Sequence, residues 1–256
     1  MNLQLLVHQL FISLCLVLIE PPAQQRAISS LPKDAQIIEE RTLSAQGYPD
    51  RKLVLWMVNP KRNPSGYGPG DPYTCPDETR GSSYSGPTRV SLLDTRRGQI
   101  INTIEIYDPH SDNNDTFDLP YQIRPGYYYH TASAGRLRET KPIILWLRDY
   151  NGDGKSLEFA LFDAPACMGL QTTLIGYVPE EDRVVQYSIE LTIIYDGQTK
   201  PETWHWIDYL FSKKPNGPGQ WKYEIDYRGR GGTLDSFLIE YDRKTRRFQG
   251  TLVRKD

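Results

Sequence analysis

The sequence predicts an all-β fold built as an antiparallel meander of hairpins. Hydrophobic runs of strand length recur along the chain and are bounded by Gly, Pro, Asn and Asp, which is the pattern of strands and turns. The composition agrees, since 17 Tyr and 5 Trp accompany 20 Gly and 19 Pro in 256 residues, and aromatic residues suit pleated, half-buried surfaces. No stretch after residue 50 has a helical period. A β-sandwich, a split barrel and a small propeller-like arrangement all fit this pattern.

The first 23 residues have the character of a signal peptide. An apolar run from Leu10 to Ile19 has the length of a signal-peptide core and is too short for a comfortable membrane span. We therefore expect export, with a secreted, periplasmic or cell-surface location and no stable membrane span after cleavage. An uncleaved anchor is the alternative.

The expected elements follow in order along the rest of the chain. Residues 24–50 are polar and are predicted to be a linker or a short helix, because residues 34–40 favour helix, and residues 51–256 are predicted to form a single all-β domain. The first strand is 52–58, and a long loop rich in Gly and Pro covers 59–87. The predicted hairpins are 88–94 with 99–106, 142–148 with 157–162, 173–178 with 184–194, 203–211 with 220–227, and 236–241 with 247–253.

Charge and cysteine content restrict the possible partners and compartment. A net charge of -2 provides no basic field, so nucleic acid is not an expected partner. Removal of the leader would leave Cys75 and Cys167 as the only cysteines. In an oxidising compartment these two are expected to form a disulfide, and two buried free thiols are the alternative.

The segment DYNGDGKSLE, residues 149–158, carries oxygen-bearing side chains at alternate positions before a turn. Asp149, Asn151 and Asp153 occupy positions 1, 3 and 5, Gly154 follows, and the carbonyl group of Lys155 falls at position 7. Calcium takes six to eight oxygen ligands, and a short loop presents them in this way. An EF-hand is disfavoured because Ala160 occupies position 12 and the flanking segments are strands.

With its flanking strands, LWLRDYNGDGKSLEFALF resembles the calcium loop of FG-GAP and VCBS repeats. That family has a carboxylate at position 9, where this chain has Leu157, with Glu158 one residue later. The resemblance covers about 15 residues and implies Ca²⁺ bound by Asp149, Asn151, Asp153, Lys155 and Glu158. Either the loop contains an extra residue that brings Glu158 inward, or Glu158 lies on the wrong face and water replaces it.

Two alternatives remain open at the level of sequence. Asn-Gly and Asp-Gly are strong turn signals, so the segment could be a plain hairpin turn without a metal ion. No motif for a nucleophile and base or for a zinc protease occurs, so no catalytic residue is predicted. We expect a calcium-stabilised binding or surface-interaction protein with a protein or carbohydrate ligand, and the alternative is a secreted carbohydrate hydrolase that uses paired carboxylates.

Overall fold

The computed structural model describes residues 31–63, 83–106, 121–122, 144–163 and 171–256. The predicted signal peptide, Cys75 and Cys167 lie outside these residues. Among the described residues, no helix has the length and apolar character needed to cross a membrane.

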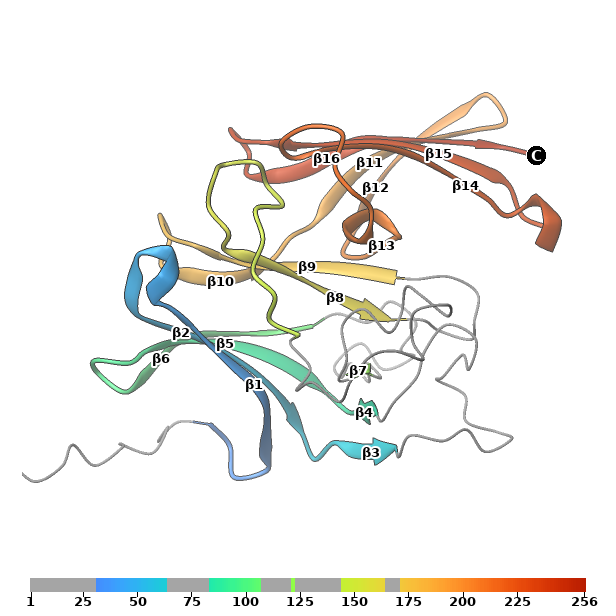
Figure 1. Ribbon diagram of the computed structural model, residues 1–256. Helices are drawn as coiled ribbons and strands as arrows, with labels where there is room; N and C mark the ends of the chain where they lie inside the picture. Colours follow the sequence, from blue (N-terminus) through green and yellow to red (C-terminus); the bar gives the residue numbers. More distant parts are fainter. Residues whose placement is uncertain (1–30, 64–82, 107–120, 123–143, 164–170) are drawn as a thin grey trace, which may run out of the picture.

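The predicted all-β class is confirmed, and the strands form sheets stacked in three layers (Figure 1). We call these layers the lower, middle and upper sheets. The described strands do not close into a barrel, and the stacking is that of a sandwich with one additional layer. The lower sheet contains β1 (Ala35–Leu43), β2 (Tyr48–Val58), β5 (Thr88–Asp94) and β6 (Gln99–Glu105).

The middle sheet is formed by four strands of the described chain, centred on β9. It contains β8 (Glu158–Asp163), β9 (Gln171–Val178), β10 (Arg183–Gln186) and β13 (Ile207–Asp208). The upper sheet has the order β12-β11-β16-β15-β14. Its strands are β11 (Ile189–Tyr195), β12 (Gln198–Trp204), β14 (Gln220–Asp226), β15 (Leu234–Asp242) and β16 (Arg247–Lys255).

The remaining elements are short. A small sheet pairs β4 with β3 on one side and with β7 on the other. Three 3-10 turns complete the described chain. The bounds are β3 (Lys61–Asn63), β4 (Ser83–Ser85), β7 (Tyr121–Gln122), η1 (Ser44–Gln46), η4 (Leu210–Ser212) and η5 (Arg228–Arg230).

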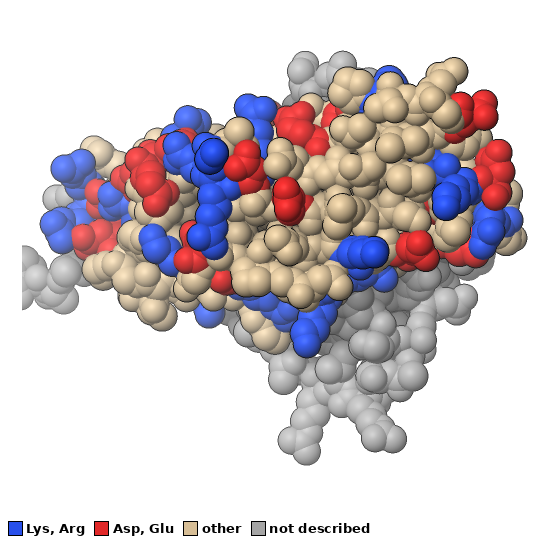
Figure 2. Space-filling model, turned by 90° about the horizontal axis from the view of Figure 1, so that it is seen from above, with Lys and Arg blue, Asp and Glu red and all other residues tan. Residues whose placement is uncertain are grey.

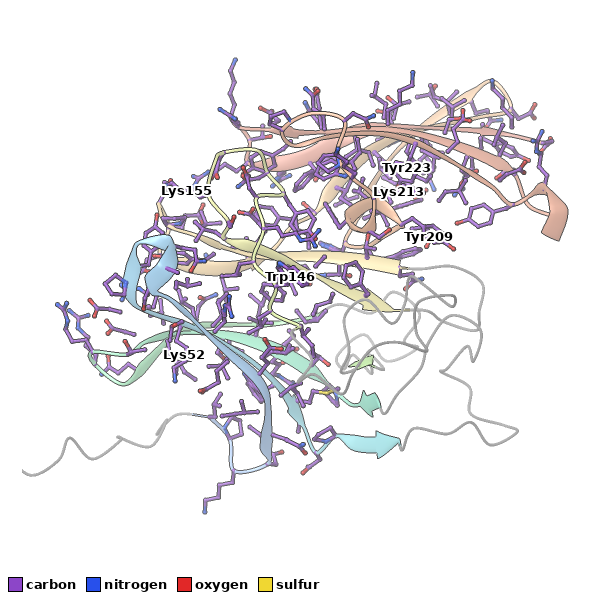
Figure 3. All side chains as sticks on the ribbon, viewed as in Figure 1. Lys52, Trp146, Lys155, Tyr209, Lys213 and Tyr223 are labelled. Atoms are coloured by element: carbon purple, nitrogen blue, oxygen red, sulfur yellow. The ribbon has the colours of Figure 1, made fainter. Side chains whose placement is uncertain are left out.

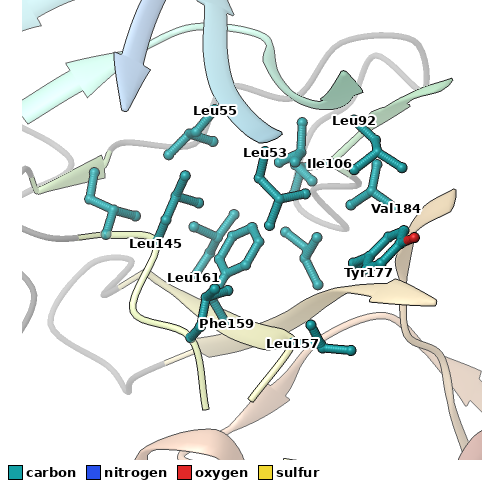
Figure 4. Packing of buried hydrophobic residues seen from close by; sticks show 14 of the residues in the cluster. Leu53, Leu55, Leu92, Ile106, Leu145, Leu157, Phe159, Leu161, Tyr177 and Val184 are labelled. Atoms are coloured by element: carbon teal, nitrogen blue, oxygen red, sulfur yellow. The ribbon is translucent and has the colours of Figure 1, made fainter. Parts of the chain in front are cut away.

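Two hydrophobic cores separate the three layers, and the middle sheet contributes to both. Figure 4 shows the lower core, in which Phe159 and Leu161 of β8 meet Leu53 and Leu55 of β2. Ala160 of β8 belongs instead to the upper core. Alternate residues of a strand point to opposite faces, so a strand buried on both sides reads as a nearly continuous apolar run. β8 is therefore buried on two faces, and a polar residue in it has to be accommodated inside the protein.

Several of the expected boundaries and pairings are wrong. Residues 35–43 form strand β1 on the edge of the lower sheet, where they pair with β2, so the interval 24–50 is not simply a linker or a short helix. Residues 184–194 divide into β10 and β11, which lie in different sheets. Strand β14 pairs with β15, and the interval 203–211 instead ends β12, forms β13 and enters η4. The meander is also interrupted, because β11 and β16 run parallel.

Candidate metal centre

The predicted calcium loop lies between residue 148 and the start of β8. Its two ends pair through the backbone, since the Arg148 amide donates to the carbonyl oxygen of Glu158 at 2.7 Å and the Glu158 amide donates in return at 3.2 Å. This is the one bridge that the described part of 142–148 makes with β8. The loop is therefore a hairpin connection, and its tip points towards the upper sheet (Figure 1).

Three of the predicted ligands organise the loop by accepting hydrogen bonds from its own backbone. The Asp149 carboxylate accepts from the amides of Asp153 at 3.1 Å and Gly154 at 2.9 Å. The Asn151 amide oxygen accepts from Asp153 N at 2.9 Å, and Asp153 Oδ1 accepts from Lys155 N at 2.7 Å. Asx side chains commonly stabilise turns in this way. Asp149, Asn151 and Asp153 therefore lie on one side of a tightly wound loop.

Glu158 turns into this loop, which settles the direction of its side chain. Its Oε2 accepts a hydrogen bond from the Tyr150 amide and its Oε1 accepts one from Asn151 Nδ2, both at 3.0 Å. The same Asn151 nitrogen is 3.3 Å from Asp153 Oδ2. Of the two alternatives for Glu158, the structure has the one in which the carboxylate points inward, although it begins strand β8.

The inward position of Glu158 makes it a buried carboxyl group. Only 1% of the residue is exposed. Burial raises the pKa of Glu158 to about 8; the hydrogen bond from Tyr150 N opposes this shift, and the nearby charges of Asp153 and Asp149 add to it. Without a cation, Glu158 therefore retains its proton to a higher pH than an exposed carboxyl group does, because burial raises its pKa.

Two neighbouring strands leave space for this carboxyl group. Gly176 of β9 is opposite Glu158, and a Cβ at Gly176 would lie 2.8 Å from Glu158 Cγ and 3.0 Å from a ring carbon of Tyr187. Tyr187 is itself buried, which raises its pKa, and the Glu158 charge adds to the effect. The space for the Glu158 side chain therefore depends on residue 176 being glycine, 18 positions further along the chain.

The loop also contacts the upper sheet closely. Gly152 has φ +73°, and a Cβ there would lie 2.5 Å from the backbone carbon of Pro218. A Cβ at Gly219 would lie 2.7 Å from the carbonyl oxygen of Asn151, and Arg243 donates a hydrogen bond to the carbonyl oxygen of Gly152. The loop therefore fastens the start of β8 in the middle sheet to two connections of the upper sheet. Figure 3 shows Lys155 in this loop, between the layers.

A cavity of about 330 Å³ adjoins the loop. Asn151 and Asp153 form one wall, and the remaining walls come from the turn after β9 and from the β15–β16 hairpin. Glu158 does not line it, so this carboxyl group has no direct access to a substrate there. The other lining residues are Tyr177, Val178, Pro179, Glu180, Tyr187, Tyr241, Arg243 and Arg246.

The oxygen ligands of the loop suit a hard cation, but their side chains do not converge on one point. All predicted ligands offer oxygen, as calcium requires. In the described part of the chain, however, no three His, Cys, Asp or Glu side chains converge closely enough to hold a metal ion. The reason is visible in the hydrogen bonds, because Asp149 and Asp153 point oxygens at backbone amides. Calcium binding would require these two carboxylates to turn towards Glu158. It would also require the Asn151 side chain, whose nitrogen donates to Glu158 Oε1, to present its oxygen instead.

Sequence reasoning missed the residues that support the loop from other elements. Gly176, Gly219 and Arg243 occur far from the motif, and nothing in their local sequence marks them. The only signal was Gly176 itself, because a glycine in the interior of a strand often marks a close approach by another group.

Three tryptophans and a histidine of the described chain do not line the cavity beside this loop. Trp221 is 1% exposed in the upper core, and Trp204 stacks on Trp206 with ring centres 5.7 Å apart. His205 lies in the bend after β12 and not within a strand. Comparison of this chain with protein-family models, curated proteins and solved structures found no match.

Proposed function

We propose that this chain is an exported β-rich binding or surface-interaction protein, stabilised by Ca²⁺ at the loop 149–158. The ligands are side-chain oxygens of Asp149, Asn151, Asp153 and Glu158 together with the Lys155 carbonyl oxygen. The ion would hold the loop in the shape that joins the middle sheet to the upper sheet. Its role is structural, and the binding surface lies elsewhere on the sheets.

The observation that carries this proposal is the burial of Glu158 beside two further carboxylates. Burying a carboxyl group costs free energy, and like charges at short range increase the cost. A plain hairpin turn needs neither the buried carboxyl group of Glu158 nor the space provided by Gly176. A divalent cation supplies the opposite charge that this arrangement lacks.

Calcium is favoured over other metals by the ligand type. The set contains no thiol and no imidazole, which zinc and copper prefer. Magnesium requires near-ideal octahedral geometry, whereas calcium accepts irregular oxygen sets. Calcium modules outside the cell typically bind with dissociation constants of about 10⁻⁴ to 10⁻³ M, which agrees with a site that must exchange internal hydrogen bonds for the ion.

The test is the stability of the full chain as Ca²⁺ is added. At a free concentration 100 times the dissociation constant, the ion is expected to stabilise the folded state by about 2.7 kcal/mol. The Asp153→Asn variant keeps an acceptor for the Lys155 amide and removes the charge, so its calcium response should be largely lost. Asp196→Asn is the matched control, since Asp196 also lies in a hairpin turn, with φ +48°, and is expected to respond like the wild type.

Two results would count against the proposal. An identical unfolding midpoint in EDTA and in Ca²⁺ at 100 times this dissociation constant, about 10–100 mM, would leave the plain turn as the correct interpretation. The same conclusion would follow if Asp153→Asn and Asp196→Asn responded equally to calcium, because the loop would then not be the site of binding.

A further inference from the structure

The outer face of the upper sheet carries a groove that is separate from the calcium loop. Its volume is about 810 Å³, in the range of ligand-binding clefts. The inner face of the same sheet packs on the middle sheet through Leu191, Ile239 and Trp221. Because side chains alternate along a strand, the neighbouring positions face outward, and Figure 2 shows this face as a broad area of mainly uncharged residues with charged residues around it.

Strand register aligns the groove across the whole sheet. Two rows of outward side chains run perpendicular to the strands, one residue from each of the five strands in each row, and every one of them lines the groove. The first row is Thr203, Glu190, Gln249, Glu240 and Gln220, and the second is Pro201, Thr192, Thr251, Leu238 and Lys222. Neighbouring strands are about 4.8 Å apart, so the rows extend for ~19 Å, and they are separated by about 6.7 Å.

Gly250 lies between the two rows on the central strand. A Cβ at this position would collide with the carbonyl oxygen of Leu238 and lie 2.9 Å from Ile239 Cα. The backbones of β15 and β16 therefore approach each other unusually closely here, as interior strand glycines permit.

The lining side chains are suited to a neutral ligand that both donates and accepts hydrogen bonds. Thr192, Thr251 and Gln249 make no side-chain hydrogen bond to another described residue, and each offers both a donor and an acceptor. The Thr203 hydroxyl donates to Glu190 at 2.8 Å, and Arg247 lies 3.1 Å from the same carboxylate, which fixes Glu190 in place. The groove thus presents an ordered set of hydroxyl, amide and carboxylate groups.

Other classes of ligand fit this surface less well. The charged lining residues are three glutamates, Glu190, Glu202 and Glu240, and one lysine, Lys222, and this excess of negative charge disfavours polyanions. An extended peptide recognised by strand addition needs a free sheet edge, whereas this groove crosses strands whose backbones are already paired. Leu238, which is 59% exposed, and Pro201 are the apolar members of the two rows, and the other eight side chains are polar or charged, which disfavours a wholly hydrophobic ligand.

We propose that the groove on the outer face of the upper sheet binds a neutral oligosaccharide, laid across the five strands. Each hydroxyl group of a sugar donates and accepts, which matches the threonine and glutamine side chains. The row spacing is that of a single sugar ring, and the length accommodates several linked rings. Recognition uses the side chains of both rows, with the ligand running from β12 to β14.

The test is calorimetric titration of the full chain with neutral hexasaccharides of glucan, xylan, mannan and galactan. We expect at least one to bind, and the double variant Thr192→Val with Thr251→Val to weaken that binding by about tenfold, because two hydroxyl hydrogen bonds are lost while shape is retained. Gln249→Ala should weaken it independently. Thr199→Val is the control, since Thr199 is an exposed threonine of β12 outside the groove.

Three outcomes would overturn this proposal. The first is that none of the saccharides binds, and the second is that the double variant and Gln249→Ala both bind like the wild type. The third is a dimer that the double variant abolishes, which would identify the face as an interface between two copies. Folded Asp153→Asn is expected to bind the saccharide normally, so a failure of the calcium proposal can be distinguished from a failure of this one.

Discussion

The buried carboxyl group of Glu158 makes the stability of the calcium-free protein depend on pH. Its pKa is about 8 in the folded state and 4.5 in the unfolded reference. A folded-state pKa that is raised means that the folded protein retains a proton which the unfolded chain releases. The resulting stabilisation is fully present below about pH 4.5 and is lost as the pH rises through about 8.

The magnitude follows from the size of the shift. One pKa unit corresponds to about 1.4 kcal/mol, so a shift of roughly 3.5 units sets an upper limit of about 5 kcal/mol. Between pH 5 and pH 8 the expected loss is up to about 3.5 kcal/mol. That is a large part of the ~5–15 kcal/mol by which folded domains are usually stable.

The assay is urea unfolding in EDTA at several pH values, followed by tryptophan fluorescence, for the wild type and Glu158→Gln. Glutamine keeps the size of the side chain and does not ionise, so the variant should lack this part of the pH dependence. The two proteins are expected to have similar stability at pH 5, and the variant should be the more stable one at pH 8. Glu240→Gln, at an exposed position on β15, serves as the control.

Calcium should reduce the difference in unfolding free energy between the two proteins at pH 8, by up to about 2.7 kcal/mol at 100 times the dissociation constant. The ion stabilises the ionised carboxylate of the wild type, whereas Glu158→Gln loses a charged ligand. Parallel curves of stability against pH for the wild type and Glu158→Gln in EDTA would refute the reasoning about burial. An unchanged difference between the two proteins on addition of calcium would instead show that Glu158 is not a ligand.

Two further substitutions test the packing, both by chemical denaturation. Gly152→Ala is expected to lower the free energy of unfolding by about 2–4 kcal/mol, because it combines a strained φ with a Cβ 2.5 Å from Pro218. Gly154→Ala, at φ +89° with open space around it, should lower it by only about 1 kcal/mol. Equal losses would show that the contact with Pro218 is unimportant. Ser91→Ala removes the hydroxyl oxygen that accepts a hydrogen bond from Trp56 Nε1 at 2.8 Å in the lower sheet. The loss should lower the free energy of unfolding by about 1–3 kcal/mol, because a buried donor is left unsatisfied. An unchanged stability would show that water replaces the serine hydroxyl group.

Local patterns predicted the strands more reliably than their partners. The hairpin of β5 and β6 was predicted close to its observed bounds, because a short turn brings the two runs together. The apolar residues of 184–194 continue without a clear break, so the pattern predicts one strand there. The structure divides it after Gln186, and the chain crosses from the middle sheet to the upper sheet. A sequence pattern records which residues are apolar and does not record which sheet buries them.

The same limit applies to the interval 34–40. Its polar residues favoured a helix, but Ile37 and Ile38 lie in β1, a strand whose pairing with β2 supplies the backbone hydrogen bonds. Edge strands often keep many exposed polar side chains, so local composition resembles that of a linker. Here tertiary pairing outweighed intrinsic propensity.

By itself the sequence determined the all-β class, the position of the 149–158 loop and the oxygen groups it contains, because alternation and turn residues act over a few neighbours. Only the tertiary structure decided that Glu158 points inward, since that depends on the space left by Gly176 in β9 and on Tyr187 beyond β10. It also decided that ten residues from five strands form two aligned rows on one face, because register is set by pairing between distant segments. Chemistry at single positions is local, whereas the burial and alignment of those positions arise from contacts between residues far apart in the chain.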